Sequence, residues 1–314
     1  MIALALLVSA GFCVATLALL NDPAIAGNAP AWFWAMVIAA WIAAGYAVSW
    51  LSALKLAGAA AQRLVDVAVP TLFGAFVFYL WEVAVRGFGV PPVLLPAPSA
   101  IAARFAASLP TLGADFVQTF VRGVLSGYAI GCLSGFLAAI AADRVVFLRR
   151  GLLPLGNFVS ALPIVGIAPI MVMWFGFDWQ SKAAVVVVMT FFPMLVNTVT
   201  GLSAAGQAER DLMRSYGAEY RQTLVKLRLP AAMPFVFNAL KINSTLALIG
   251  AIVAEFFGTP IVGMGFRISI EAARMSLDMV WAEIALAAIA GTAFYGVVAL
   301  AERAATFWHP SYRS

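Results

Sequence analysis

Apolar runs long enough to cross a bilayer as helices, about 20 residues each, recur along almost the whole chain. Short polar or proline-rich segments separate them. The pattern predicts eight transmembrane helices, at residues 2–20, 31–53, 66–86, 116–141, 152–176, 183–203, 237–257 and 279–301. We therefore expect an all-α membrane protein.

The composition supports this expectation. Hydrophobic residues make up 64% of the 314 residues and charged residues only 11%, and the mean hydropathy is +0.98. A soluble core cannot bury so much apolar surface, so the chain belongs in a bilayer.

Basic residues predict the orientation of the helices, because cytoplasmic loops carry an excess of Lys and Arg. With the N-terminus in the cytoplasm, the segments 54–65, 142–151, 204–236 and 302–314 lie inside. Together with Lys241 they hold most of the 19 basic residues: Lys55, Arg63, Arg144, Arg149, Arg150, Arg210, Arg214, Arg221, Lys226, Arg228, Arg303 and Arg313. The other six are Arg86, Arg104, Arg122, Lys182, Arg267 and Arg274. Both termini are thus predicted to be cytoplasmic. The net charge of +5 then reflects topology and does not indicate nucleic-acid binding.

The first run, residues 2–20, has two interpretations. Small residues follow it, as they follow a secretory signal, but it has no basic n-region and exceeds the about 7–15 residues of a signal core. We interpret it as a retained helix, with cleavage as the alternative.

Residues 87–114 interrupt the apolar pattern on the predicted outer side. Four prolines, at positions 91, 92, 96 and 98, stop a helix there. The following SAIAARFAASL predicts a short helix at the membrane interface, with Ser99 as its N-cap.

The polar segment 204–236 is amphipathic. Apolar residues recur at helical spacing on one face and arginines on another: Leu212, Met213, Tyr216, Tyr220, Leu224 and Leu227 against Arg210, Arg214, Arg221 and Arg228. A surface helix with arginines among lipid headgroups would explain this pattern. Gly217 favours a sharp turn or a close approach by a partner instead. Pro230 is expected to end the segment and to hold Leu229 in an extended conformation, so that the chain re-enters the bilayer at Pro234.

Asp211, Gly217, Leu227, Leu229 and Pro230 have a spacing that resembles the cytoplasmic signature loop of binding-protein-dependent ABC importer permeases. That pattern is Glu-Ala-Ala, three residues, Gly, nine residues, Ile-x-Leu-Pro. The resemblance implies docking on a separate ATPase, with Tyr216, Gly217 and Ala218 at the inserted tip. Asp211, Leu212 and Met213 replace Glu-Ala-Ala, which puts the local packing in question.

The resemblance covers residues 66–305 and implies a type I importer permease core of about six transmembrane helices. The implied domains are an extra N-terminal helix pair, 1–60, and a transmembrane domain, 61–314, with its coupling loop at 204–236. The stretch Leu-Pro-x-Pro-Ser at 95–99 is similar to the nitrate, sulfonate and taurine branch. Within that branch FFPMLVNT, residues 191–198, is similar to permeases for pyrimidine or riboflavin-like compounds.

Two transmembrane patterns have competing interpretations. Gly123, Gly127, Gly131 and Gly135 form a four-residue ladder that favours close helix packing, within the chain or between two copies. Proline breaks the spans at Pro163, Pro169 and Pro193. With Trp174, Asn197 and Glu255, these positions are expected to line a solute pathway, although such kinks also occur in helices that only pack.

The remaining polar residues offer little catalytic chemistry. Glu82, near Arg86, together with Glu255 and Glu283, fits an interfacial position, with a substrate or proton-relay role as the alternative. Asn238 and Asn243 are candidates for hydrogen bonds between helices. Cys13 and Cys132 are interpreted as packing residues, His309 as a surface residue, and we expect no metal site.

The chain contains no GxxxxGK[ST] sequence and no HExxH, so we expect it to bind no cofactor and not to be an enzyme. The resemblance implies ATP-Mg on a cytoplasmic ATPase dimer, an external solute-binding protein and a second permease chain, which together drive alternating access. The implied solute is a nitrate-, sulfonate- or taurine-like anion or a pyrimidine-like precursor. A secondary transporter driven by an ion gradient is the alternative, and it would require titratable groups near the bilayer centre.

Overall fold

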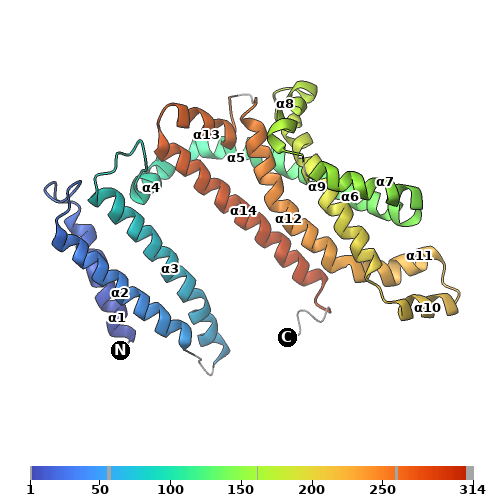
Figure 1. The fold of residues 1–314 in the computed structure, drawn as a ribbon, viewed down its shortest axis with the longest axis horizontal. Helices are drawn as coiled ribbons and strands as arrows, with labels where there is room; N and C mark the ends of the chain where they lie inside the picture. The colour runs from blue at the N-terminus through green and yellow to red at the C-terminus, as the bar shows by residue number, and fades with distance from the viewer. Residues whose placement is uncertain (1, 55–57, 161, 259–260, 309–314) are drawn as a thin grey trace. The chain divides into compact units, whose positions relative to one another are not determined.

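The computed structural model describes residues 2–54, 58–160, 162–258 and 261–308, with the side chains of residues 2–6, 157 and 160 outside the description. Every regular element in these ranges is a helix (Figure 1). Six of the described helical segments are long and apolar enough to cross a membrane. The all-α expectation is confirmed, while Lys55, His309 and Arg313 lie outside the described residues.

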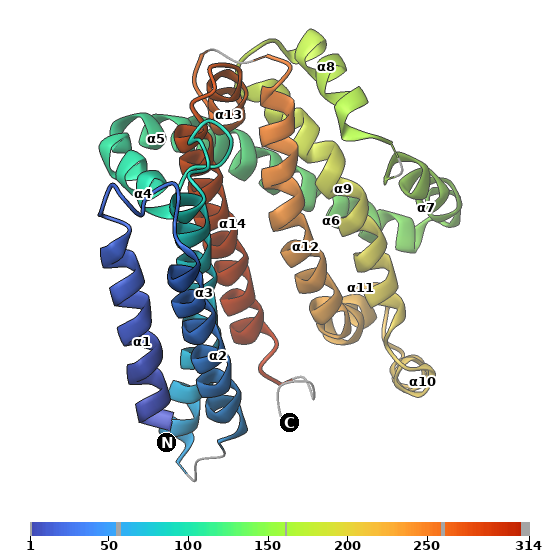
Figure 2. The same cartoon turned by 60° about the vertical axis from the view of Figure 1, so that its left-hand side comes forward.

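The chain forms two compact units, and each is described by itself. Unit 1 comprises Met1–Ala107 and Met275–Ala282. Its helices are α1 (Ile2–Leu19), α2 (Ala31–Ala53), α3 (Ala59–Gly87), α4 (Pro98–Ala107) and the first residues of α14 (Leu277–Ala305). Helices α1, α2 and α3 lie side by side (Figures 1 and 2) around Leu20, Phe33, Val37, Tyr79 and Val83. The expected division at residue 60 stays a prediction.

Unit 2 comprises Ser108–Arg274 and Glu283–Ser314. Its helices are α5 (Leu109–Phe116), the π-helical η1 (Val117–Val124), α6 (Leu125–Arg144), α7 (Val146–Ser160), α8 (Ile164–Phe175), α9 (Trp179–Ser203), α10 (Gln207–Ser215), α11 (Tyr220–Thr223), the π-helical η2 (Leu224–Arg228), α12 (Leu229–Glu255), α13 (Met264–Ala273) and the rest of α14. Helix α9 packs extensively against both α6 and α12. Its ends connect to α8 and α10, which therefore lie at opposite ends of the unit (Figures 1 and 2).

The glycine ladder packs inside unit 2. A Cβ at Gly127 would lie 2.6 Å from Val186 Cβ and 2.7 Å from Ala183 O on α9, and one at Gly135 would lie 2.5 Å from Phe191 O. Only glycine allows this approach of two backbones, and small residues are what bring helices together in lipid. The interpretation of the ladder as packing within the chain is confirmed.

The expected span 152–176 is wrong as a single helix. It is divided between α7, which ends at Ser160, and α8, which begins at Ile164 after Pro163 as its N-cap. Pro163 has no N–H to donate to a preceding carbonyl, and its ring excludes the helical conformation from the residue before it. The helix therefore breaks at this proline.

The short helix expected after residue 98 is confirmed as α4, and its place at the membrane interface stays a prediction, but the role expected for Ser99 is wrong. The helix begins at Pro98, and Ser99 donates its backbone N–H and its hydroxyl to the Glu82 carboxylate at 2.9 and 2.7 Å. Arg86 also contacts Glu82, at 3.4 Å. The start of α4 is thus attached to α3 by a buried carboxylate.

Gly127→Ala should destabilise unit 2 by about 1–3 kcal/mol, because the added methyl group overpacks the contact between α6 and α9. Gly151→Ala is the matched control, since it lies in helix α7 with nothing within 4 Å of its added Cβ. Thermal unfolding in detergent should show a lower midpoint for Gly127→Ala and no loss for Gly151→Ala. Equal midpoints would contradict the packing described.

Candidate functional site

Gly217 ends helix α10 in a left-handed turn. Its φ is +69°, its N–H donates to Arg214 O at 2.9 Å, and the N–H of Ala218 donates to Met213 O at 2.9 Å. These two bonds form a Schellman motif, in which a glycine satisfies the last carbonyls of a helix. The turn expected at this glycine is confirmed, and its backbone is internally hydrogen-bonded.

The turn presents apolar side chains to its surroundings. Tyr216 is 81% exposed and Leu212, one helical turn earlier, is 56% exposed. Asp211 lies on the exposed surface of α10 and Ala218 is half-buried. An exposed tyrosine and leucine at the end of one short helix form a small contact surface that nothing in the described part of unit 2 covers.

The chain after this turn continues as a helix, contrary to the extended conformation expected at Leu229. Leu229 has φ −64° and ψ −48°, and Pro230 lies in the first turn of α12. A proline ring would collide with the carbonyl of a regular α-helical turn before it. The wider π-helical η2, which includes Leu227, immediately precedes α12. In a π-helix each backbone hydrogen bond spans one more residue than in an α-helix.

An ion pair fixes the base of this segment. Arg228 donates two hydrogen bonds to the Asp143 carboxylate at the end of α6, at 2.7 and 2.5 Å. Its third nitrogen donates to Leu202 O on α9 at 3.0 Å, and the hydroxyl of Tyr220 donates to Asp143 at 2.9 Å. Bidentate pairs between arginine and carboxylate are strong and directional. One arginine thus connects η2 to both α6 and α9.

Further contacts hold the two ends of the segment 204–228. Arg210 on α10 donates to Ser203 O at 2.7 Å, and Arg144 lies 5.6 Å from the centre of the Tyr220 ring. Asp143 is not among the residues that the sequence pattern indicated. Two features of the sequence could have indicated it. Asp143 is an isolated acidic residue at the predicted cytoplasmic end of a span, and a loop further along the chain contains several arginines.

A second polar cluster lies at the other end of unit 2, where α13 begins. Three consecutive backbone N–H groups, of Gly263, Met264 and Gly265, donate to Asp115, Thr119 and Glu255 at 2.6, 2.8 and 2.7 Å. The first N–H groups of a helix have no carbonyl partner within the helix itself. Side chains from α5, η1 and α12 supply their acceptors.

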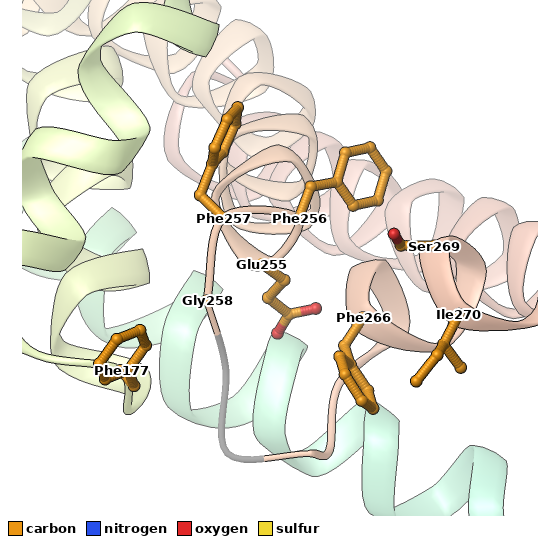
Figure 3. Close-up of a pocket in the computed structure, with 8 residues that line it drawn as sticks. All are labelled: Phe177, Glu255, Phe256, Phe257, Gly258, Phe266, Ser269 and Ile270. Atoms are coloured by element: carbon orange, nitrogen blue, oxygen red, sulfur yellow. The ribbon is translucent and has the colours of Figure 1, made fainter. Parts of the chain in front are cut away.

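Glu255 is the centre of this cluster and also lines a cavity of about 310 Å³ with Phe177 and Phe266 (Figure 3). Its Oε1 accepts from the Thr119 hydroxyl at 2.8 Å and its Oε2 from Gly265 N–H. Nearby, the buried Lys182 donates to Phe177 O at 2.5 Å and to Gly258 O. The residues on both sides of the connection between α12 and α13 are therefore held by side chains.

An ion pair between Arg267 and Asp115 lies at the edge of the cluster. Arg267 donates to Asp115 Oδ2 at 2.9 Å, and this hydrogen bond raises the pKa of Arg267 above its usual value. The buried Glu283 has Asp115 and Arg267 as charged neighbours. Glu255 and Glu283 are 2% and 0% exposed, so both carboxyl groups lie inside the protein, and their depth in a bilayer stays a prediction.

The six residues expected to line a pathway lie in three places. Pro163 is exposed before α8, Pro169 is half-buried and Trp174 is exposed. In α9, Asn197 donates to Pro193 O at 2.8 Å and accepts from Asn238 at 3.4 Å, which confirms an interhelical contact for Asn238. Asn243 similarly donates to Thr190 O. Glu255 is the member of the six that lines the cavity of Figure 3.

Asp143→Ala should destabilise the fold by about 3 kcal/mol, because it leaves the Arg228 guanidinium without its carboxylate. Amide hydrogen exchange across residues 207–228 should also become faster. Asp211→Ala is the control, since the exposed Asp211–Arg214 pair at 3.5 Å contributes about 0–1 kcal/mol. If both variants exchanged like the wild type, Asp143 would not anchor the segment.

Thr119→Val keeps the side-chain shape but removes the hydroxyl between Met264 N–H and Glu255. We expect a loss of about 1–3 kcal/mol and faster exchange at the start of α13, because a buried N–H loses its acceptor. Thr119→Ser should restore both properties. Thr200→Val, which removes an exposed hydroxyl that donates to Val196 O in its own helix, should change neither.

The sequence is similar to those of transport permeases. It is 33% identical over 189 residues, 60% of this chain and 75% of the relative, to the formylaminopyrimidine transport permease protein ThiX of Halalkalibacterium halodurans. It is 28% identical to the riboflavin transport system permease protein RibX of Chloroflexus aurantiacus, covering 74% of this chain and 86% of the relative. The taurine transport system permease protein TauC of Escherichia coli is 26% identical, with 79% and 91% covered.

Residues 131–309 match the family described as binding-protein-dependent transport system inner membrane component. Such a component is the permease of an ABC transporter for small solutes and is not itself an enzyme. It works with an ATPase and a solute-binding protein. With more than half of its length in the match, the chain belongs to this family of multi-pass inner-membrane permeases.

Proposed function

We propose that this permease moves its solute into the cytoplasm by alternating access and that the Gly217 turn docks on the ATPase. The observation that carries the proposal is a turn that is exposed at its tip and anchored at its base. Tyr216 and Leu212 extend from unit 2, while Arg228 holds the segment to α6 and α9. A rigid, exposed element of this kind can transmit the motion of a partner to the helices.

ATP-Mg binds the ATPase in this proposal, because the sequence of the permease has no phosphate-binding loop. Two ATPase subunits would approach each other when ATP binds. Each would move one permease chain, so a second permease, identical or related, encloses the pathway. Asp211, Leu227, Leu229 and Pro230 shape the docked segment, and Tyr216, Gly217 and Ala218 form its tip.

The distribution of basic residues supports an orientation with both termini and α10 in the cytoplasm. The opposite end of unit 2, which carries α13, then faces outward and receives the solute-binding protein. The pathway between these ends would be bordered by Pro163, Pro169 and Trp174 of the α8 region, by Pro193 and Asn197 of α9, and by Glu255 of α12. Residues 1–60 contribute an additional helix pair that does not belong to the permease core in this proposal.

The solute is a small polar or anionic molecule in this proposal. The names of similar permeases give formylaminopyrimidine, riboflavin, aliphatic sulfonates, taurine and bicarbonate as solutes of those proteins. We infer a solute of the same kind, a nitrate-, sulfonate- or taurine-like anion or a pyrimidine-like precursor.

Gly217→Trp should abolish copurification of the ATPase from native membranes, because the new side chain fills the docking surface. Gly176→Trp is the matched control: φ is +82° at Gly176 and +69° at Gly217, and both have nothing within 4 Å of an added Cβ. Both substitutions therefore strain the backbone at a position of positive φ, and only Gly217→Trp places the indole ring on the proposed docking surface. Mass spectrometry should detect the ATPase with the wild type and with Gly176→Trp.

Two results would contradict the proposal. Equal loss of the ATPase from both variants would show that strain, and not docking, is responsible. Retention of the ATPase by Gly217→Trp would show that the turn lies outside the contact.

A further inference from the structure

Arg122 is a charged residue on an exposed surface within a membrane-spanning segment. It belongs to the π-helical η1 inside the candidate span Leu109–Arg144, and it is exposed in unit 2. A guanidinium facing lipid at such a place is unfavourable, so charged residues in spans face protein or a water-filled space. The surface around Arg122 is therefore a candidate for the wall of a water-filled space.

Neighbouring side chains hold Arg122 in a defined polar row. Gln118 accepts from the Arg122 guanidinium at 3.2 Å and donates its amide to Asp178 Oδ1 at 2.9 Å. The N–H of Trp179 donates to the same Asp178 oxygen at 2.8 Å. These two bonds, that of Gln118 foremost, lower the pKa of Asp178 below its usual value. The row consists of a cation, an amide and an anion in fixed order.

The row borders a cleft of about 660 Å³, which Val117 and Gly113 also line. The opposite face of η1 packs inside unit 2. There Thr119 donates a hydrogen bond to Glu255 of α12 and accepts one from Met264 N–H at the start of α13. Segment η1 thus has a structural face and a polar, open face. π-Helical turns of this kind occur frequently at functional sites.

The hydrogen-bonding groups of this row differ in how many partners they have. The Asp178 oxygen nearest Gln118 already accepts two hydrogen bonds. Within the described part of the chain, the Arg122 guanidinium donates to Gln118 through one of its five N–H groups. The cleft therefore offers hydrogen-bond donors of positive charge, which suit an oxygen acceptor on a small molecule.

We propose that Gln118, Arg122 and Asp178 form part of the wall of the solute pathway at its outer mouth, and that Arg122 donates hydrogen bonds to an acceptor oxygen of the solute. A sulfonate, a carboxylate or a ring carbonyl has such an oxygen. This inference rests on the proposed importer function, which sets the outward direction and the two access states.

Val117→Cys supplies a reporter thiol inside the cleft, because Val117 is 43% exposed and lines the same space. Cys13 and Cys132 are first replaced by alanine, so that the reporter is the only thiol. The variant is reconstituted in proteoliposomes and treated from outside with anionic sulfonatoethyl or cationic trimethylammonioethyl methanethiosulfonate. Ile130→Cys, at a position 54% exposed on α6, is the control for a thiol facing lipid and should react slowly with both reagents.

Adding Arg122→Gln to the Val117→Cys variant should lower the ratio of anionic to cationic labelling rates at the reporter thiol about tenfold, because a charge beside a cleft controls the local concentration of ions. Arg149→Gln, at the other end of unit 2, should leave the ratio unchanged. This comparison needs only the permease. An unchanged ratio with Arg122→Gln would overturn the role of Arg122 in binding acceptor groups.

The complete complex of permease, ATPase and binding protein tests the pathway assignment. The reporter thiol of the Val117→Cys variant should react faster in the vanadate-trapped ATP state, when the outer mouth is open, than without nucleotide. Equal rates in the two states, or no reaction in either, would overturn the assignment. The proposed importer function fails separately, when no ATPase copurifies or the binding protein does not stimulate ATP hydrolysis.

Discussion

The close approach of α6 to α9 is the constraint on which the rest of unit 2 depends. Glycines at 127, 131 and 135 allow contact between the two backbones, and any side chain larger than hydrogen would separate them. In lipid, water does not drive helices together, so association relies on close packing and on hydrogen bonds. Asn243 adds such a bond from α12 to Thr190 O on α9. Three helices are thus held as one block around α9.

This block connects the two polar clusters of unit 2. Helix α6 continues from η1, which carries Thr119, to Asp143 at its other end. Helix α12 extends from the Arg228 anchor to Glu255. The continuous helices η1–α6 and η2–α12 each carry, at one end, a partner in the Asp143–Arg228 anchor and, at the other end, a residue of the α13 cluster. A displacement at one end of these packed helices reaches the other end without a change of secondary structure, because close-packed helices transmit strain.

The two clusters satisfy their backbone N–H groups in different ways. An unpaired backbone N–H costs several kcal/mol in hydrocarbon. At the start of α13, three backbone N–H groups are paired with side chains from other elements. Gly263 is required there, because an added Cβ would lie 2.5 Å from Glu255 Oε1. At the Gly217 turn the backbone satisfies its own groups, which leaves the side chains free for a partner. One cluster therefore stabilises the fold and the other presents a surface.

The sequence by itself determined the helical class, most of the spans and the Gly217 turn, because apolar length, basic residues and a helix-ending glycine are local properties. It also indicated internal packing for the glycine ladder. The extended conformation predicted for Leu229 and the N-cap role predicted for Ser99 were wrong, because the first depends on a π-helical segment and the second on Glu82 from another helix. Tertiary structure alone decided that Asp143 meets Arg228, that Thr119 meets Glu255 and that Asp115 meets Gly263, because these pairs are separated by 85 to 148 residues in sequence. Hydrophobic periodicity sets which residues form a helix, but only the packing of helices brings their ends together.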